Sequence, residues 1–499
     1  GPPDGGRCPM FETELKFRIP SGRSDAVLRA VATPAAQRVR LQAVYFDTPD
    51  FALARARMAL RLRKEGRVWV QTLKAGGGLM GRLEHEVTLT AAALEPALDI
   101  ARHDGTPAGA ALRAVLAQAA PLGALYRTDV QRTLRLVRVP GGTVEIACDR
   151  GHLIAGVGAA QRRAVIDELE FELKRGDAAA LVTLAARWAQ RYGLWWDLRS
   201  KAEMGLRLAT ATPGGPAVRA RPATVTADAA PAAAFAQTLQ AALAQALPNA
   251  GELADGTGGA EHLHQLRVAL RRLRGALRLL APWSADAEAA LALERDWRGP
   301  FAQLGEMRDA DVVERCFGDA LRAAGAPGLP QGAAPGGPAP AELVRSEAFT
   351  ALLMRTLQLS LQPAPDMPPV ALPLAARERL RAAWRQARPG IDGFAQADEA
   401  ARHRLRRQLK RLRDTLDAVA PVWPAKAVRR HARALGAAVD ALGRLSDIAA
   451  ARMRCAQALD SEPAAAFAAG WLAAEQPHAV AAAAQALAAL RATPRSWQG

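Results

Sequence analysis

Charged side chains occupy alternate positions in four segments of the N-terminal half of the chain: 12–16, 61–63, 82–86 and 168–174. In a β-strand, residues two apart point to the same face, so each segment presents a row of charge on one face. Carboxylates bind hard divalent cations, and arginine and lysine bind phosphate oxygens. A solvated face would explain one such strand, but four strands with both signs of charge favour a cavity that holds a metal–polyphosphate complex.

The elements that must position these charges are strands. Alternating patterns predict them, and 3.6-residue periodicity predicts helices near 24–32, 108–119 and 177–193. Strands at this density, mostly joined by short turns, predict an α+β fold with an antiparallel sheet or barrel and flanking helices. The predicted strands are 11–19, 58–64, 67–74, 82–90, 143–149 and 164–174.

A second set of charges recurs in the C-terminal half. On a helix, His264, Arg267, Arg271, Arg274 and Arg278 lie within an arc of about 80°. No acid occurs in 262–280, so these like charges repel one another unless an anion lies among them, whereas a solvated helix face usually includes acids. The pattern repeats about 139 residues later, which indicates two related helical bundles. The second copy consists of His403, Arg406, Lys410 and Arg413.

Composition shifts along the chain predict its domains. We expect a tag remnant or loose tail at 1–9, a mixed domain at 10–211 and a linker at 212–226. Residues 227–499 are predicted to be almost entirely helical, interrupted by low-complexity loops at 324–341 and 362–373.

The bulk properties restrict the environment and the partners. The net charge of +17 in 499 residues predicts an acidic partner. Four scattered cysteines without a CxxC pair, no signal peptide before Met10 and no convincing membrane span predict a reduced, cytoplasmic protein. The basic helices carry no aromatic residue between their arginines, which disfavours single-stranded nucleic acid as the partner.

Residues 10–210 resemble the CYTH family of triphosphate tunnel metalloenzymes, because a whole series of that family's motifs occurs in order. The resemblance implies an eight-stranded antiparallel tunnel in which a metal-positioned water attacks the terminal phosphorus of a triphosphate. The series consists of Glu12, Glu14 and Lys16; Arg61 and Arg63; Lys74; Arg82, Glu84 and Glu86; Arg127 and Arg132; Asp149 and Gly151; Glu168, Glu170, Glu172 and Lys174; and Ser200, Lys201 and Glu203.

The resemblance also assigns roles. Mg²⁺ or Mn²⁺ would be held by Glu12, Glu14, Asp149, Glu170 and Glu172. The triphosphate would be bound by Lys16, Arg61, Arg63, Lys74, Arg82, Arg132 and Lys201. The residues assigned to catalysis are Glu12, Glu14, Lys16 and Lys201.

Residues 227–499 resemble the CHAD family, which implies a helical double bundle that binds inorganic polyphosphate through the two basic rows. Arg308, Asp309 and Asp311 fit that family's second motif. The second copy departs from it, because Ser446 replaces the arginine and Ala449 the second aspartate. This departure places an equal role of the two halves in question.

The leading hypothesis is an inorganic triphosphatase joined to a polyphosphate-binding module, as in bacterial CYTH–CHAD proteins, with possible association with polyphosphate granules. One alternative keeps the fold and changes the substrate to thiamine triphosphate or ATP, including ATP cyclisation. Another is a non-catalytic protein that binds polyphosphate or the backbone of duplex nucleic acid. The sequence leaves the preferred metal, the oligomeric state and any coupling of the domains open.

Overall fold

A computed structural model describes residues 10–89, 95–221, 225–309, 312–328, 338–364, 370–460 and 462–497. It divides into two compact units. The first comprises the residues up to Val218 together with Leu247–His262 and Ala341–Leu361, and the second comprises Arg219–Ala246, Leu263–Pro340 and Gln362–Gly499. Two helical segments that follow the predicted linker therefore pack with the N-terminal domain.

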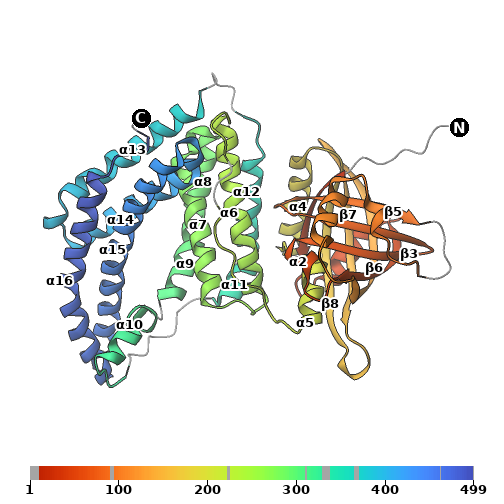
Figure 1. Cartoon of the computed structure of the whole chain (residues 1–499), viewed down its shortest axis with the longest axis horizontal. Coiled ribbons are helices and arrows are strands. Elements are labelled where there is room, and N and C mark those ends of the chain that lie inside the picture. The colour runs from red at the N-terminus through yellow and green to blue at the C-terminus, as the bar shows by residue number, and fades with distance from the viewer. Residues whose placement is uncertain are drawn as a thin grey trace. The chain divides into compact units, whose positions relative to one another are not determined.

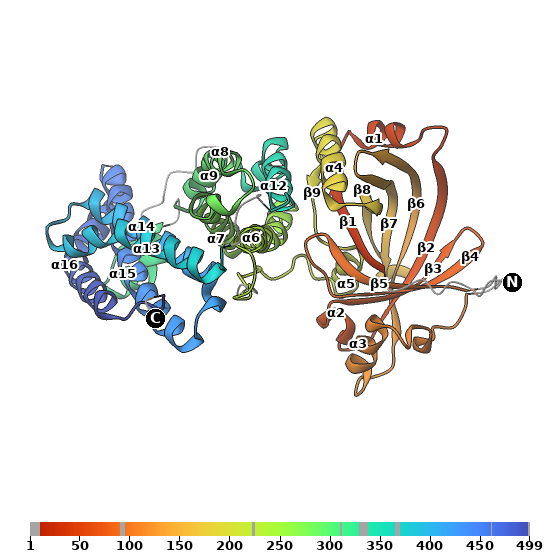
Figure 2. The ribbon, with the colours of Figure 1, turned by 90° about the horizontal axis from the view of Figure 1, so that it is seen from above.

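Eight antiparallel strands of the first unit close into a barrel (Figure 2). The order is β5-β4-β3-β2-β6-β7-β8-β1, and pairing of β1 with β5 completes the ring; the two-residue β9 extends β1. The predicted barrel is confirmed. Six strands coincide with predicted segments, and β2 and β6 are additional. The strands are β1 Met10–Arg18, β2 Gln37–Asp47, β3 Met58–Glu65, β4 Val68–Ala75, β5 Gly81–Leu89, β6 Gly123–Val139, β7 Gly142–Ala155, β8 Arg162–Gly176 and β9 Trp195–Trp196.

Strand alternation sorts apolar and charged side chains to opposite faces of the barrel wall. Phe17 and Phe171 are fully buried and pack edge to face at 5.8 Å between ring centroids. Phe171 also contacts Trp188 of α4 (Ala178–Tyr192), which covers β1, β7 and β8 from outside (Figure 2). The intervening charged residues of β1 and β8 consequently face the lumen.

Helix α5 (Lys201–Thr210) occupies one end of that lumen. Its apolar side chains pack against a cluster on the inward-facing positions of β2, β6, β7 and β8, which includes Leu41, Val130, Leu153 and Ile166. The Tyr126 hydroxyl of the same cluster donates a hydrogen bond of 2.9 Å to the Ala202 carbonyl. The lumen is therefore apolar and filled at this end, and charged beyond it.

The remaining described helices before residue 211 are short, and the helices after residue 226 form the predicted helical part of the chain (Figure 1). None of the described helices is long and apolar enough to span a bilayer. The helices are α1 Ser24–Val31, α2 Ala52–Arg55, α3 Pro107–Leu116, α6 Pro231–Ala254, α7 Ala260–Leu279, α8 Ala287–Asp296, α9 Arg298–Asp309, α10 Val312–Ala323, α11 Pro340–Arg345, α12 Glu347–Ser360, α13 Leu372–Asp392, α14 Glu399–Val419, α15 Ala425–Ala458 and α16 Pro463–Ala492.

Candidate anion-binding sites

Lys201 lies at the centre of the charged part of the lumen. The Ser200 side chain accepts a hydrogen bond from the Glu203 backbone and caps α5, so Lys201 becomes the first residue of that helix. Its Nζ lies 2.8 Å from Asp149, 3.0 Å from Glu168 and 2.6 Å from Glu170. Three carboxylates raise the pKa of this buried ammonium well above its ordinary value, although burial opposes the shift.

Arg132 holds the same carboxylates from β6. Its Nε and Nη2 each donate 2.7 Å hydrogen bonds to the two oxygens of Asp149, and Nη2 also lies 2.5 Å from Glu170. Burial would raise the pKa of Glu170, but Lys201 and Arg132 lower it well below its ordinary value. Asp149, which is fully buried, has both oxygens engaged by one guanidinium.

A second cluster joins β1, β4 and β5. Lys74 Nζ lies 2.9 Å from Glu12 and 3.2 Å from Glu84. Arg82, register partner of Glu12, contacts both Glu12, at 2.9 Å, and Glu14. Lys16 completes the β1 row, with its Nζ 3.0 Å from Glu168. All members come from inward-facing positions, as the alternation predicted.

The arginine pair of β3 also faces inward. Arg61 donates a 3.1 Å hydrogen bond to the Tyr45 hydroxyl, and Arg63 contacts Glu65 and, at 3.4 Å, Glu86. Arg127 differs from the other motif residues, because it is exposed and pairs with Val44 on the outward-facing register of β6. Its predicted place in the motif series does not bring it into the lumen.

Several lumen carboxylates have raised pKa values. Burial, with neighbouring Glu12 and Glu170, raises the pKa of Glu14, although Arg82 and Lys74 oppose the shift. Burial raises the pKa of Glu84 to about 8, and burial with Glu12 and Glu145 raises that of Glu172. Crowded, buried carboxylates of this kind gain stability from a divalent cation.

The described side chains contain no ready-made group of three or more metal-ligating residues. Lysines and arginines form ion pairs with the lumen carboxylates. The donor set is nevertheless all oxygen, as Mg²⁺ and Mn²⁺ prefer. Glu14 and Glu172 are direct register partners across β1 and β8, and Glu12 lies within electrostatic range of both. The residues fit a divalent cation once their basic partners turn to another anion.

The sequence analysis gave no binding or catalytic role to two residues that lie in the lumen. Glu168, 2% exposed, contacts both Lys16 and Lys201, and its place in the alternating row was the signal available. Tyr45 supports Arg61 from β2, a strand that the prediction did not include.

The basic row of α7 lies in the second unit and is half-buried along its length. Glu294 of α8, 2% exposed, lies 2.7 Å from Arg274 and 3.8 Å from Arg278. The guanidinium carbons of Arg267 and Arg274 lie over the Phe301 ring, 4.7 and 4.9 Å from its centroid. These contacts fix the direction of the arginines.

The predicted second row, on α14, meets the first. Arg271 and Asp414 lie 3.3 Å apart, and a Cβ at Gly275 would stand 3.7 Å from Asp414. Burial and the charges of Arg406 and Arg271 lower the pKa of Lys410 to about 7, so cations of both copies share one region. His403, at the start of the row, is exposed, and His264, Arg406 and Arg413 are half-buried.

Arg411 joins this basic region although it was not predicted. Burial and Arg411 lower the pKa of Arg278 to about 10, which places the two guanidinium groups in electrostatic contact. Arg298, 2.9 Å from Glu294, also borders the region. The side chains of Arg308, Asp309 and Asp311 lie outside the described residues.

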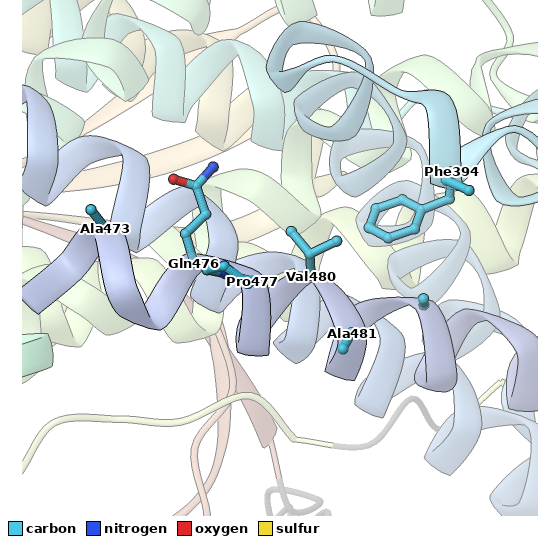
Figure 3. A pocket seen from close by; sticks show the side chains of 8 residues that line it. Phe394, Ala473, Gln476, Pro477, Val480 and Ala481 are labelled. Atoms are coloured by element: carbon cyan, nitrogen blue, oxygen red, sulfur yellow. The ribbon is translucent and has the colours of Figure 1, made fainter.

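An apolar depression elsewhere on the second unit differs from the two charged candidate sites. Phe394, Gln476, Pro477 and Val480 line it together with alanines of α16 (Figure 3). No charged side chain contributes, so this depression is not suited to an anion.

Residues 10–198 match the family model of the CYTH domain, and residues 237–456 match that of the CHAD domain. Over 180 residues the chain is 31% identical to an inorganic triphosphatase of Haemophilus influenzae, covering 34% of this chain and 47% of that protein, so the chain spans about half the length of this relative. The crystal structure of the CHAD domain from the plant Ricinus communis is 24% identical, covers 57% of this chain and 99% of that one, and gives a TM-score of 0.43. A putative adenylyl cyclase from Hippeastrum, described as revealing a dominant triphosphatase activity, is 17% identical, covers 40% of this chain and 96% of that one, and gives a TM-score of 0.28. The chain therefore carries a CYTH domain followed by a CHAD domain.

Proposed function

We propose that the barrel hydrolyses inorganic triphosphate with the help of a divalent metal ion. The observation that carries this proposal is the set of ion pairs in the lumen, where carboxylates and basic groups alternate in nearly equal numbers. The lysines and arginines of these pairs would bind the oxygens of a triphosphate, and the carboxylates they release would hold a divalent cation. The inorganic triphosphatase of Haemophilus influenzae, similar in this region, supports the assignment.

Each predicted residue then has a role. The triphosphate would be bound by Lys16, Arg61, Arg63, Lys74, Arg82, Arg132 and Lys201. Mg²⁺ or Mn²⁺ would be held by Glu12, Glu14, Glu170, Glu172 and Asp149. Asp149 also fixes Arg132, since both of its oxygens accept from that guanidinium. When bound, the metal supplies an activated water and neutralises oxygen charge. The lysines and arginines stabilise charge that moves to the leaving oxygens during attack on the terminal phosphorus.

The aromatic lining favours an inorganic substrate over one that carries a base. Among the described inward-facing residues of the eight strands that close the barrel, β1 to β8, the aromatic ones are Tyr45 and Tyr126. They stack on each other with centroids 4.8 Å apart, lie beside α5, and are 4% and 7% exposed. The described residues of these eight strands thus offer no free aromatic face to a thiazole or adenine ring, and Trp195 of β9 is 7% exposed with the Arg199 guanidinium over its ring.

The experiment compares phosphate release from tripolyphosphate, thiamine triphosphate and ATP at equal concentration, with and without Mg²⁺ or Mn²⁺. We expect metal-dependent release from tripolyphosphate in large excess over the other two. Equal rates on all three would refute the substrate assignment, and release that survives chelation would refute the metal requirement.

We further propose that the joined basic rows of α7 and α14 bind inorganic polyphosphate. The supporting observation is the meeting of the two basic rows, where Arg271 lies 3.3 Å from Asp414 and a Cβ at Gly275 would stand 3.7 Å from Asp414. Burial and the charges of Arg406 and Arg271 lower the pKa of Lys410 in this region, so the cations repel one another. A polyanion relieves this repulsion. Binding of a labelled polyphosphate, with duplex DNA as competitor, tests this; displacement by DNA at equal phosphate concentration would contradict it.

A further inference from the structure

Lys16 is fixed through the backbone of the segment that precedes α5. Its Nζ donates a hydrogen bond to the Arg199 carbonyl, and its own carbonyl accepts a 3.0 Å bond from the Asp197 N–H. The same Nζ lies 3.0 Å from Glu168, the carboxylate it shares with Lys201. The position of Arg199 therefore helps to set the position of a predicted catalytic lysine.

The Arg199 side chain is 2% exposed and surrounded by acids from two parts of the chain. Asp197 accepts two bonds of 2.9 Å from its Nε and Nη2. Asp255, which follows α6, lies 2.8 Å from Nη2, and Glu252 of α6 lies 3.8 Å from Nη1. Asp255 and Glu252 both belong to the segment 247–262, which packs in the barrel unit although it lies within the CHAD match.

Glu252 also holds α5, the helix that presents Lys201. Its Oε1 lies 2.6 Å from Arg207 Nη1, and its Oε2 accepts a 2.6 Å bond from the Thr257 hydroxyl. Glu252 is itself 2% exposed, so breaking these contacts leaves a buried charge without a partner.

Gly251 is the residue that allows this approach. A Cβ at this position would stand 2.9 Å from Arg199 Nε and 3.2 Å from its Cζ, closer than packed atoms come. A glycine inside a helix costs roughly 1 kcal/mol relative to alanine. Here the glycine lets the Arg199 guanidinium lie directly against the α6 backbone. The cost of this glycine indicates that the contact between Arg199 and α6 matters to the protein.

We propose that Glu252 and Asp255 are positioning residues for the barrel reaction: by holding Arg199 and Arg207, these two acids of the CHAD segment align Lys16 and Lys201 in the lumen. The inference rests on the proposed triphosphatase function. Neither acid touches the substrate in this scheme. Their effect passes through the Arg199 carbonyl to Lys16 and through α5 to Lys201. Displacing a catalytic group by about 1 Å can lower the rate by up to 10²-fold.

The test uses the full chain with Asp255→Asn and Glu252→Gln, singly and together, and Asp255→Glu as the conservative variant. Glu288→Gln, an exposed acid of α8, is the matched control. We measure kcat and KM for tripolyphosphate, tripolyphosphate affinity by calorimetry, and Tm. The expected result is a fall in kcat/KM of about tenfold in each single variant, partial recovery in Asp255→Glu, and wild-type values in the control.

The outcomes separate this inference from the function on which it rests. An active wild type with unchanged kcat and KM in all three Asn and Gln variants overturns the positioning role, as does a lower Tm with full activity well below it. If the wild type releases no phosphate, the proposed function fails. In that case the tripolyphosphate affinities test the positioning role. Weaker binding by Asp255→Asn than by the wild type supports this role, and equal binding overturns it.

Discussion

Replacement of Lys201 by methionine tests the electrostatics of the lumen directly. The ammonium lies within 3.0 Å of three carboxylates, of which Asp149 and Glu168 have side chains 1% and 3% exposed. Methionine keeps much of the length and apolar stem of lysine but removes the charge. Arg132 remains, so Asp149 and Glu170 keep one basic partner each.

Removing one member of a buried ion pair costs about 3–5 kcal/mol, because an uncompensated charge stays behind. For a domain of this size that corresponds to a fall in Tm of about 6–20 °C at pH 7. The pKa values of Asp149 and Glu170 are held low in part by Lys201. Such groups stabilise the fold above their unfolded pKa and lose this contribution as the pH falls through the folded pKa. The difference in Tm between wild type and variant is therefore largest at pH 7 and shrinks below about pH 4.

The assay is thermal unfolding of both proteins at pH 7 and at a series of pH values below about 4, with and without Mg²⁺. We expect millimolar Mg²⁺ to raise the Tm of Lys201→Met more than that of wild type, because the cation can take the place of the ammonium among three oxygens. Equal Tm values at pH 7 would refute the charge argument. A magnesium shift equal in both proteins would refute the view that the cation and Lys201 compete for the same carboxylates.

Two further sets of variants test whether the two domains act independently, and a pH profile tests the ionisation of the basic region. Glu12→Gln is expected to lower tripolyphosphate turnover at least about 10²-fold while leaving polyphosphate affinity unchanged, measured by phosphate release and fluorescence titration. Arg267→Ala combined with Arg271→Ala should weaken polyphosphate binding and reduce its salt dependence while turnover stays at the wild-type value; a parallel loss of turnover would contradict two separate sites. The pKa of Lys410 is about 7. Polyphosphate affinity should consequently fall between pH 6 and pH 8 as this ammonium loses its proton, and Lys410→Arg should flatten that profile.

The fold and the lumen were largely predictable because strand geometry is periodic. Residues two apart share a face, so the row Glu168, Glu170 and Glu172 could be assigned to one side of the wall from sequence alone. The same rule places Arg127 and Arg132 on opposite faces of β6, because an odd number of positions separates them. The resemblance placed both arginines in one motif, and strand parity indicates which of them faces the lumen.

The partners of these residues were not predictable, because they depend on packing between distant segments. Nothing in the local sequence of Arg199 indicates Asp255 as its partner, and Gly251 reads simply as a weak point in a helix. Arg411 likewise enters the basic region only because α14 approaches α7 closely at Gly275 and Asp414. Long-range contacts of this kind follow from the tertiary fold and not from periodicity.

The family boundaries and the folded units do not coincide, and this limits how such chains can recombine. Helix α12 lies in the middle of the CHAD match, yet it packs with α4 in the barrel unit. A chimera joined within 212–226 would set a foreign α4 against the resident α12 and a foreign partner against Gly251. Exchange of barrels between relatives therefore requires the matching α12 and the end of α6 to travel with the barrel, although they lie far from it in sequence.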